Sequence, residues 1–147
     1  IKRLYVAIVI MFKKRLFERI KDIDKKNDAI CSQDEYIVSI IYYINKLLFV
    51  RKGSCLINKN FGMDNLYSST DNSVSFFIKN AQQEIQNIIT KYEPRLKNVV
   101  VTHFDTSGVN EHIFKIKAKL VKNDDNIILD CTLSSDQRVT IRSLENK

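Results

Sequence analysis

Apolar residues recur at helical spacing in three stretches of the chain, which predicts three helices. The first is a short amphipathic helix over residues 12–23. The second follows a capping sequence, Ser32 to Glu35, in which the serine hydroxyl can accept a hydrogen bond from the Glu35 amide. The third runs from about residue 72 to residue 92, where Pro94 stops it because its ring cannot continue a helix. The apolar face of the second helix comprises Ile37, Ile40, Ile41, Ile44, Leu47 and Leu48, and that of the third Val74, Phe77, Ile78, Ala81, Ile85, Ile88, Ile89 and Tyr92.

A basic turn ends the second predicted helix. Arg51 and Lys52 lie near its negative end, and Gly53, followed by Ser54, predicts a left-handed stop. Residues 55–72 have no sustained period and contain several Asn and Ser residues. They predict a structured loop, with a short strand near Leu56 and Ile57.

After Pro94 the period of the apolar positions changes to two, which is typical of half-buried strands. The predicted strands cover residues 98–103, 112–121, 127–133 and 138–142. Helices first and an antiparallel meander afterwards indicate an α+β fold. We therefore expect N-terminal helices packed on a small antiparallel sheet of three to four strands.

The length of 147 residues suits one compact domain, which we place at residues 12–147. Residues 1–11 form a charged start followed by a short apolar stretch, far below the roughly 20 residues of a membrane span. We interpret residues 1–11 as an N-terminal extension. Because Met11 and the residues after it resemble a natural start, we expect residues 1–10 to be foreign to the native protein.

The net charge of +7 is concentrated at the front of the chain. Residues 1–60 hold 13 Lys and Arg against 6 Asp and Glu, whereas residues 61–147 hold 11 of each. The front of the molecule is therefore expected to face an acidic partner, which can be a protein surface, a nucleic acid or an anionic lipid.

The residues that usually carry chemistry form no catalytic or metal-binding pattern. Cys31, Cys55 and Cys131 are scattered and odd in number, which indicates buried or incidental thiols in a reducing compartment. His103 and His112 flank a strand connection without informative ligand spacing. We expect no metal, no cofactor and no catalytic residue.

Four short motifs follow one another in a specific order. Residues 16–20 read LFERI, residues 47–54 read LLFVRKGS, residues 61–63 read FGM and residues 93–96 read EPRL. They resemble the LxERI, LLNTRxGS, YGLPD and EPRL motifs of the TssE family of type VI secretion baseplate subunits, which is related to a baseplate wedge protein of contractile-tailed phages. The chain departs from the second motif at Phe49 and Val50 and from the third after its glycine. The resemblance covers about residues 12–142.

The resemblance implies a non-catalytic baseplate subunit of a contractile injection machine. Relatives bind the other wedge proteins (TssF, TssG and TssK-like proteins) and offer a β region on which contractile sheath proteins begin to polymerise. It implies no cofactor, no small-molecule substrate and no direct membrane insertion. The expected location is cytoplasmic, at the inner-membrane-associated baseplate.

The predicted partner-binding residues lie at two helix ends and on the last strand. Arg95 can offer a planar fork of donors to a partner's carboxylate, or it can form an internal pair with Glu93, and the two roles are compatible. The last strand is either an edge open to strand addition or an edge kept apart by its arginines. The full set is Glu93, Pro94, Arg95, Arg51, Gly53, Ser54, Arg138 and Arg142.

Two other function classes remain open. A lysozyme-like glycosidase needs two carboxylates about 5–10 Å apart across the sugar, yet the available glutamates lie in no cleft motif. A nucleic-acid-binding module would use the basic strand face, but Phe114 falls in the opposite, core-facing register. The glutamates are Glu18, Glu84, Glu93 and Glu111, and the lysines of that strand face are Lys115, Lys117 and Lys119.

Overall fold

The structure is a computed structural model that describes residues 12–13, 15–16, 20, 30–64, 66, 73–104, 111–134 and 139–143. The chain divides into two compact units, Ile1–Ser39 and Ile40–Lys147. The predicted extension, residues 1–11, lies outside the described residues and stays a prediction.

The first unit contains a two-stranded antiparallel pair, β1 (Phe12–Lys13) and β2 (Ile30–Cys31). The helix predicted from residue 12 is therefore wrong at its start, because these two residues pair with β2. Leu16 and Ile20 further along are helical. Near a helix end, helical spacing of apolar residues favours the helix only weakly, so pairing with another strand can determine the structure instead.

Helix α2 (Gln33–Phe49) begins with the predicted cap, since the Glu35 amide donates to the Ser32 Oγ at 3.2 Å. Helix α3 (Val74–Tyr92) is capped by Ser73, whose side chain accepts from the Phe76 amide at 3.3 Å. Both helices match their predicted positions, although α2 ends at Phe49, four residues before Gly53. Gly53 lies in the turn that follows, with a φ of 86°.

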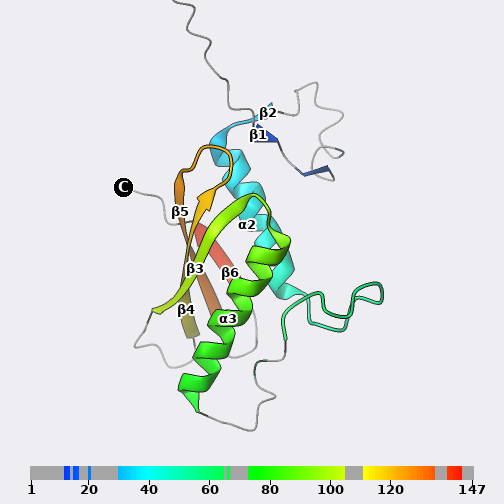
Figure 1. Cartoon of the computed structure of the whole chain (residues 1–147), viewed down its shortest axis with the longest axis vertical. Helices are drawn as coiled ribbons and strands as arrows, with labels where there is room; N and C mark the ends of the chain where they lie inside the picture. The colour runs from blue at the N-terminus through cyan, green and yellow to red at the C-terminus, as the bar shows by residue number, and fades with distance from the viewer. Residues whose placement is uncertain are drawn as a thin grey trace, which may run out of the picture. The chain divides into compact units, whose positions relative to one another are not determined.

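Strands β3 (Leu96–Phe104), β4 (Glu111–Leu120), β5 (Asn126–Ser134) and β6 (Val139–Ser143) form an antiparallel meander in the order β3-β4-β5-β6 (Figure 1). Alternate residues of β4 and β5 are buried, as the period of two predicts. The register shifts between Lys97 and Val100, where Asn98 takes a φ of 53°. The fold is thus the predicted α+β arrangement, with four strands.

The core lies between the helices and one face of the sheet. Each Leu or Ile buried there contributes on the order of 1.5–3 kcal/mol. The helices supply Ile40, Ile44, Leu47 and Leu48 from α2 and Ala81, Ile85, Ile88 and Ile89 from α3; the sheet supplies Val99, Val101, Phe114, Ile116, Ala118, Leu120, Ile127, Leu129, Cys131, Leu133 and Ile141.

Burial raises the pKa of the Cys131 thiol to about 12. This thiol therefore stays protonated at neutral pH and serves as a small apolar core residue, as predicted. Cys55 is a free thiol that is partly exposed.

Candidate partner-binding site

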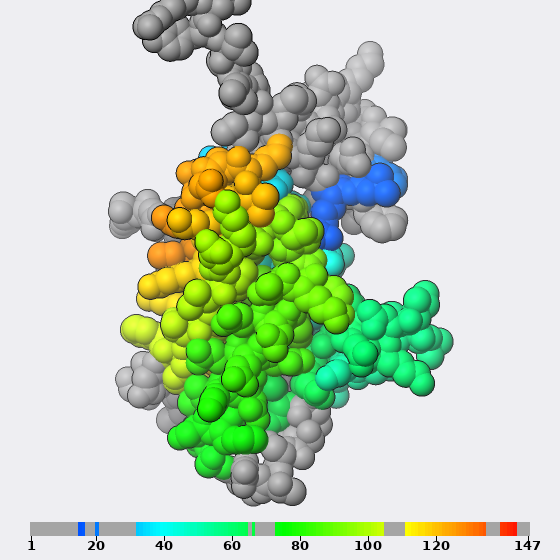
Figure 2. Space-filling view, viewed as in Figure 1, coloured from blue at the N-terminus to red at the C-terminus, as the bar shows by residue number. Residues whose placement is uncertain are grey.

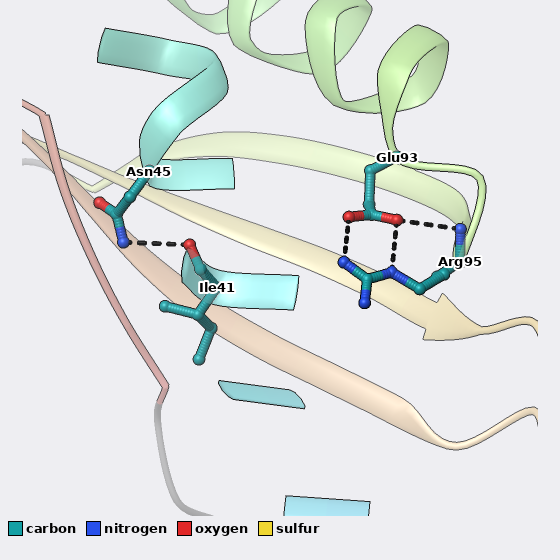
Figure 3. A network of polar contacts seen from close by, with 4 residues as sticks. All are labelled: Ile41, Asn45, Glu93 and Arg95. Atoms are coloured by element: carbon teal, nitrogen blue, oxygen red, sulfur yellow. Dashed lines mark hydrogen bonds and ion pairs between the residues drawn. The ribbon is translucent and has the colours of Figure 1, made fainter. Parts of the chain in front are cut away.

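A bidentate ion pair fixes the corner where α3 turns into β3. The Arg95 Nε donates to the Glu93 Oε1 and the Arg95 Nη2 to the Oε2, both at 2.8 Å, as Figure 3 shows. The Arg95 amide donates to the same Oε1 at 3.2 Å. Pro94 between them is exposed and makes the sharp turn possible. We call Glu93, Pro94 and Arg95 the corner.

The corner is an internal structural joint. The side chain of Glu93 is 0% exposed and that of Arg95 is 12% exposed. The Glu93 carbonyl accepts from the Leu96 amide, and the Arg95 carbonyl accepts from the Val121 amide at 2.9 Å. A carboxylate buried to this degree depends on its partner, because an unpaired buried charge is strongly unfavourable. The internal pair is therefore present; whether the corner also contacts a partner stays a prediction.

The predicted basic turn is the start of a projecting arm, residues 51–64. The arm leaves the end of α2 as the teal loop in Figure 1 and stands out from the rest of its unit in Figure 2. Its two ends are joined, since Met63 donates to the Val50 carbonyl at 2.7 Å and Lys52 donates to the Met63 carbonyl at 2.9 Å. The predicted short strand at residues 56–57 is wrong, because both residues lie in a bend.

Glycine is required at the base of the arm. Gly62 has a φ of 103°, and a Cβ added there would overlap the carbonyl oxygen of Val50. Gly53 also has a positive φ, 86°, but a Cβ there would meet open space. Gly62 therefore permits the close approach of the two chain segments, whereas Gly53 supplies a turn.

Residues of the predicted basic turn form hydrogen bonds within the arm. The Gly53 amide donates to the Lys59 carbonyl at 3.0 Å. The Ser54 Oγ and amide both donate to the Arg51 carbonyl, at 2.6 and 3.2 Å. The backbone of Gly53 and the hydroxyl of Ser54 thus shape the arm, and the guanidinium of Arg51 lies exposed beside it.

The arm and the corner lie next to each other. Phe61 of the arm packs edge-on against Tyr92, the last residue of α3, with 5.0 Å between ring centroids. Lys52 donates to the Asp64 Oδ2 at 2.8 Å, and this hydrogen bond raises the pKa of Lys52. The structure therefore brings together two of the three predicted groups of site residues.

The third predicted group lies on the sheet edge. Arg142 is exposed on β6 and faces Asp130 across the strands, while Arg138 lies outside the described residues. Ile141 donates its amide to the Asn45 Oδ1 at 3.0 Å, and Asn45 in turn donates to the Ile41 carbonyl (Figure 3). Because β6 is the last strand of the sheet, the Asn45 side chain of α2 binds a backbone amide that would otherwise be available at this edge.

The opposite edge has a similar arrangement. On β3, the Val101 carbonyl accepts from the Gln82 side chain at 2.7 Å, and its amide donates to the Gln86 Oε1 at 3.5 Å. Amide side chains of the helices thus bond to both edge strands, a common way of keeping edges from pairing with other chains. Sequence reasoning missed these contacts, and a polar residue such as Asn45 amid an apolar helix face was the available signal.

The outer face of the sheet carries the predicted row of lysines, Lys115, Lys117 and Lys119. Phe104 lies on the same face, is 53% exposed, and has the Lys115 Nζ at 4.6 Å from its ring centroid. Sequence reasoning considered Phe114, which is buried in the core as predicted, and overlooked Phe104 on the neighbouring strand.

The two histidines belong to an aromatic cluster. The rings of His103 and His112 lie 5.6 Å apart, with Phe114 against the first and Phe77 against the second, each at 5.3 Å. Within the described part of the chain, no group of three His, Cys, Asp or Glu residues is placed to hold a metal ion. None of the described helices is long and apolar enough to cross a membrane.

Comparison with known families identifies the class of protein. The family model of the baseplate wedge protein gp25 matches residues 35–125, well over half of the chain. The chain therefore belongs to the gp25 baseplate wedge family. The match includes the arm, the corner and the first two strands of the sheet, β3 and β4. No curated protein matches the sequence.

Among solved structures, the chain resembles one from Geobacter sulfurreducens described as a "putative tail lysozyme". The TM-score is 0.55 at 15% sequence identity, over 82% of this chain and 99% of the other. At this identity the likeness concerns the fold, and it agrees with the α+β arrangement described above.

Proposed function

We propose that the protein is a structural baseplate component of a contractile injection machine of the type VI secretion kind, where it docks wedge subunits and nucleates sheath assembly. The observation that carries this proposal is the gp25 family match over residues 35–125, which spans the arm and the corner. The four TssE-like motifs support the narrower assignment. The protein would work in the cytoplasm, at the inner-membrane-associated baseplate.

Wedge proteins of the TssF, TssG and TssK kinds are the proposed partners of the arm and the corner. Arg51 and Pro94 are exposed and lie on the two adjacent features. Glu93 is completely buried against Arg95, so its carboxylate can contribute by shaping the corner rather than by direct contact. Gly53 and Ser54 contribute in the same indirect way, by holding the backbone of the arm.

Sheath proteins are the proposed partners of the sheet edge at β6. The Ile141 amide points away from β5 toward Asn45, so the backbone groups of Val139 and Ser143 point the same way along the strand. A sheath strand that paired here would add to the sheet by backbone hydrogen bonds. It would have to compete with Asn45 for the Ile141 amide.

A catalytic role has little support from the candidate carboxylates. Of the glutamates considered, Glu93 is bound at both oxygens by Arg95, which suits a structural carboxylate and not a general acid. We therefore propose that the protein is not an enzyme. Loss of turbidity in a peptidoglycan suspension would contradict this.

A second candidate, nucleic-acid binding, has one specific observation in its favour. Phe104 is exposed beside Lys115 on the basic outer face, and an aromatic ring among lysines can stack a base. Sheets that bind single strands usually stack two or three bases, whereas the other exposed large apolar residue described on this face is aliphatic, Val100. Binding of RNA or DNA that weakens steeply with salt and with Phe104→Ala would favour this candidate.

Co-purification from the native host tests the proposal. The tagged full-length protein should bring down baseplate wedge proteins and sheath proteins, identified by mass spectrometry, and recovery should survive nuclease treatment. If the protein is recovered alone, or with nucleic acid that salt removes, the proposal is wrong.

A further inference from the structure

The tip of the arm presents two large aliphatic side chains to solvent. Leu56 is 93% exposed and Ile57 is 99% exposed, the highest values among the exposed large apolar residues described. Single exposed apolar residues are ordinary on protein surfaces. These two residues are adjacent in the middle of the projecting arm, and we call the pair the tip.

The backbone beneath the tip is held in place by hydrogen bonds. Gly53 donates to the Lys59 carbonyl, and Phe61 donates to the Asn58 carbonyl, both at 3.0 Å. The Asn58 side chain accepts from the Asn60 amide at 3.1 Å. Because the loop is ordered in this way before it meets a partner, little conformational entropy would be lost on binding.

The arm carries more positive than negative charge, with Arg51, Lys52 and Lys59 against Asp64. Lys52 is paired with Asp64, but Arg51 and Lys59 are exposed and, within the described part of the chain, make no ion pair. A pocket that receives the tip would be favoured by carboxylates on its rim, opposite these two cations.

We propose that the tip inserts into an apolar pocket, rimmed by Asp or Glu residues, on a neighbouring baseplate protein. This inference rests on the proposed function and adds to it the contact that anchors the subunit. Interfaces usually concentrate their affinity in a few side chains that fill pockets, surrounded by weaker polar contacts. Leu56 and Ile57 would be those side chains, and Arg51 and Lys59 would supply the rim contacts.

A lipid surface fits the tip less well than a protein pocket. A single myristoyl chain gives marginal, reversible membrane binding, and Leu56 and Ile57 together offer only about eight side-chain carbons. Arg51 and Lys59 would each add only about 1 kcal/mol on an anionic membrane. Two aliphatic side chains are enough to fill an apolar pocket on a protein.

The test uses tagged full-length protein in the native host, as wild type, the double variant Leu56→Ser/Ile57→Ser, and Val74→Ser as the matched control. Val74 is an aliphatic residue that is 62% exposed at the start of α3, away from the arm in sequence. The double variant should unfold at the same urea concentration as wild type, yet recover baseplate wedge proteins about tenfold less or worse. Val74→Ser should recover them at the wild-type level.

Photo-crosslinking identifies the receiving surface. With p-benzoylphenylalanine in place of Ile57, illumination should yield an adduct with one baseplate protein, and the crosslinked peptide should lie in an apolar pocket flanked by Asp or Glu. Lys59→Glu should reduce the yield of this adduct.

The outcomes separate the inference from the proposed function. If the folded double variant recovers wedge proteins as wild type does, or if the photo-probe labels lipid alone, the inference is wrong while the baseplate role stands. If wild type recovers no baseplate protein at all, the proposed function fails and the inference fails with it.

Discussion

The corner and the arm are neighbours, joined by the packing of Phe61 on Tyr92, yet they are built in opposite ways. At the corner, a charged carboxylate is wholly buried and both its oxygens are bonded to one guanidinium. At the tip of the arm, two aliphatic side chains are almost wholly exposed. Polar groups lie inside and apolar groups outside, the reverse of the usual distribution.

The difference indicates separate tasks. A buried ion pair adds little net stability compared with apolar packing, but it fixes one geometry and its removal is costly. An exposed apolar pair adds nothing to the fold and is available for a partner. We therefore assign the corner chiefly to the geometry of the fold and the tip chiefly to binding, and each prediction below tests one side of this division.

The largest expected effect on stability comes from Arg95→Ala. This change removes the bidentate guanidinium from the buried Glu93 carboxylate, and we expect the free energy of unfolding to fall by about 3–5 kcal/mol. Urea denaturation followed by circular dichroism measures it. The double variant Glu93→Gln/Arg95→Met removes both charges and should recover part of the loss. A loss below about 1 kcal/mol for Arg95→Ala would mean that the pair is not structural.

Gly62→Ala should disrupt the base of the arm. An alanine at this position would be strained by the φ of 103°, and its methyl group would overlap the carbonyl oxygen of Val50. The base of the arm must therefore shift. We expect a loss of more than about 2 kcal/mol. Gly53→Ala is the matched control, because its methyl group meets open space and it should cost only about 1–2 kcal/mol for its positive φ. Equal losses for the two variants would show that the close approach at Gly62 is unimportant.

A smaller effect is expected at the sheet edge. Asn45→Ala removes the acceptor of the Ile141 amide and should cost about 1–2 kcal/mol, measured by urea denaturation. Asn45→Asp keeps an acceptor oxygen. Below the pH at which its carboxyl ionises, it should lower the free energy of unfolding by less than Asn45→Ala does. If sheath strands pair with β6, Asn45→Ala should not weaken sheath recovery, because it removes a competitor for that amide.

The reactivity of Cys55 and Cys131 compares the arm with the core in a protein whose fold is left intact. Burial raises the pKa of Cys131 to about 12, so at pH 8 only about one thiol in ten thousand would be ionised. In a Cys31→Ser background, iodoacetamide should label Cys55 of the folded protein and reach Cys131 only after unfolding. Labelling of Cys131 in the folded protein at a rate similar to that of Cys55 would contradict the burial of this strand.

Much of the second unit could be predicted from the sequence, because its signals are local. The apolar stripe of α3, the stop at Pro94 and the alternation along β4 each follow from a few neighbouring residues. The Glu93–Arg95 pair was foreseen as one of two compatible roles, since two residues of opposite charge flank a proline.

The rest depends on contacts between residues that are distant in the sequence. Phe12 forms a strand because it pairs with Cys31, and no pattern near Phe12 indicates this. The bond between Asn45 and Ile141 joins residues 96 positions apart. The apolar pair Leu56 and Ile57 was predicted as a strand, because two adjacent residues have no period that distinguishes a strand from an exposed loop.

The most direct test of the division between corner and arm is to compare Arg95→Ala with Leu56→Ser/Ile57→Ser in the same preparations from the native host. Urea unfolding measures stability, and mass spectrometry measures recovered wedge proteins per folded molecule. We predict that Arg95→Ala is less stable by several kcal/mol while its folded fraction still recovers its partners, and that the tip variant is as stable as wild type and loses them. An Arg95→Ala protein that is fully stable and recovers no wedge protein, beside a tip variant that recovers them normally, would place the main docking contact at the corner instead of the tip and contradict this division.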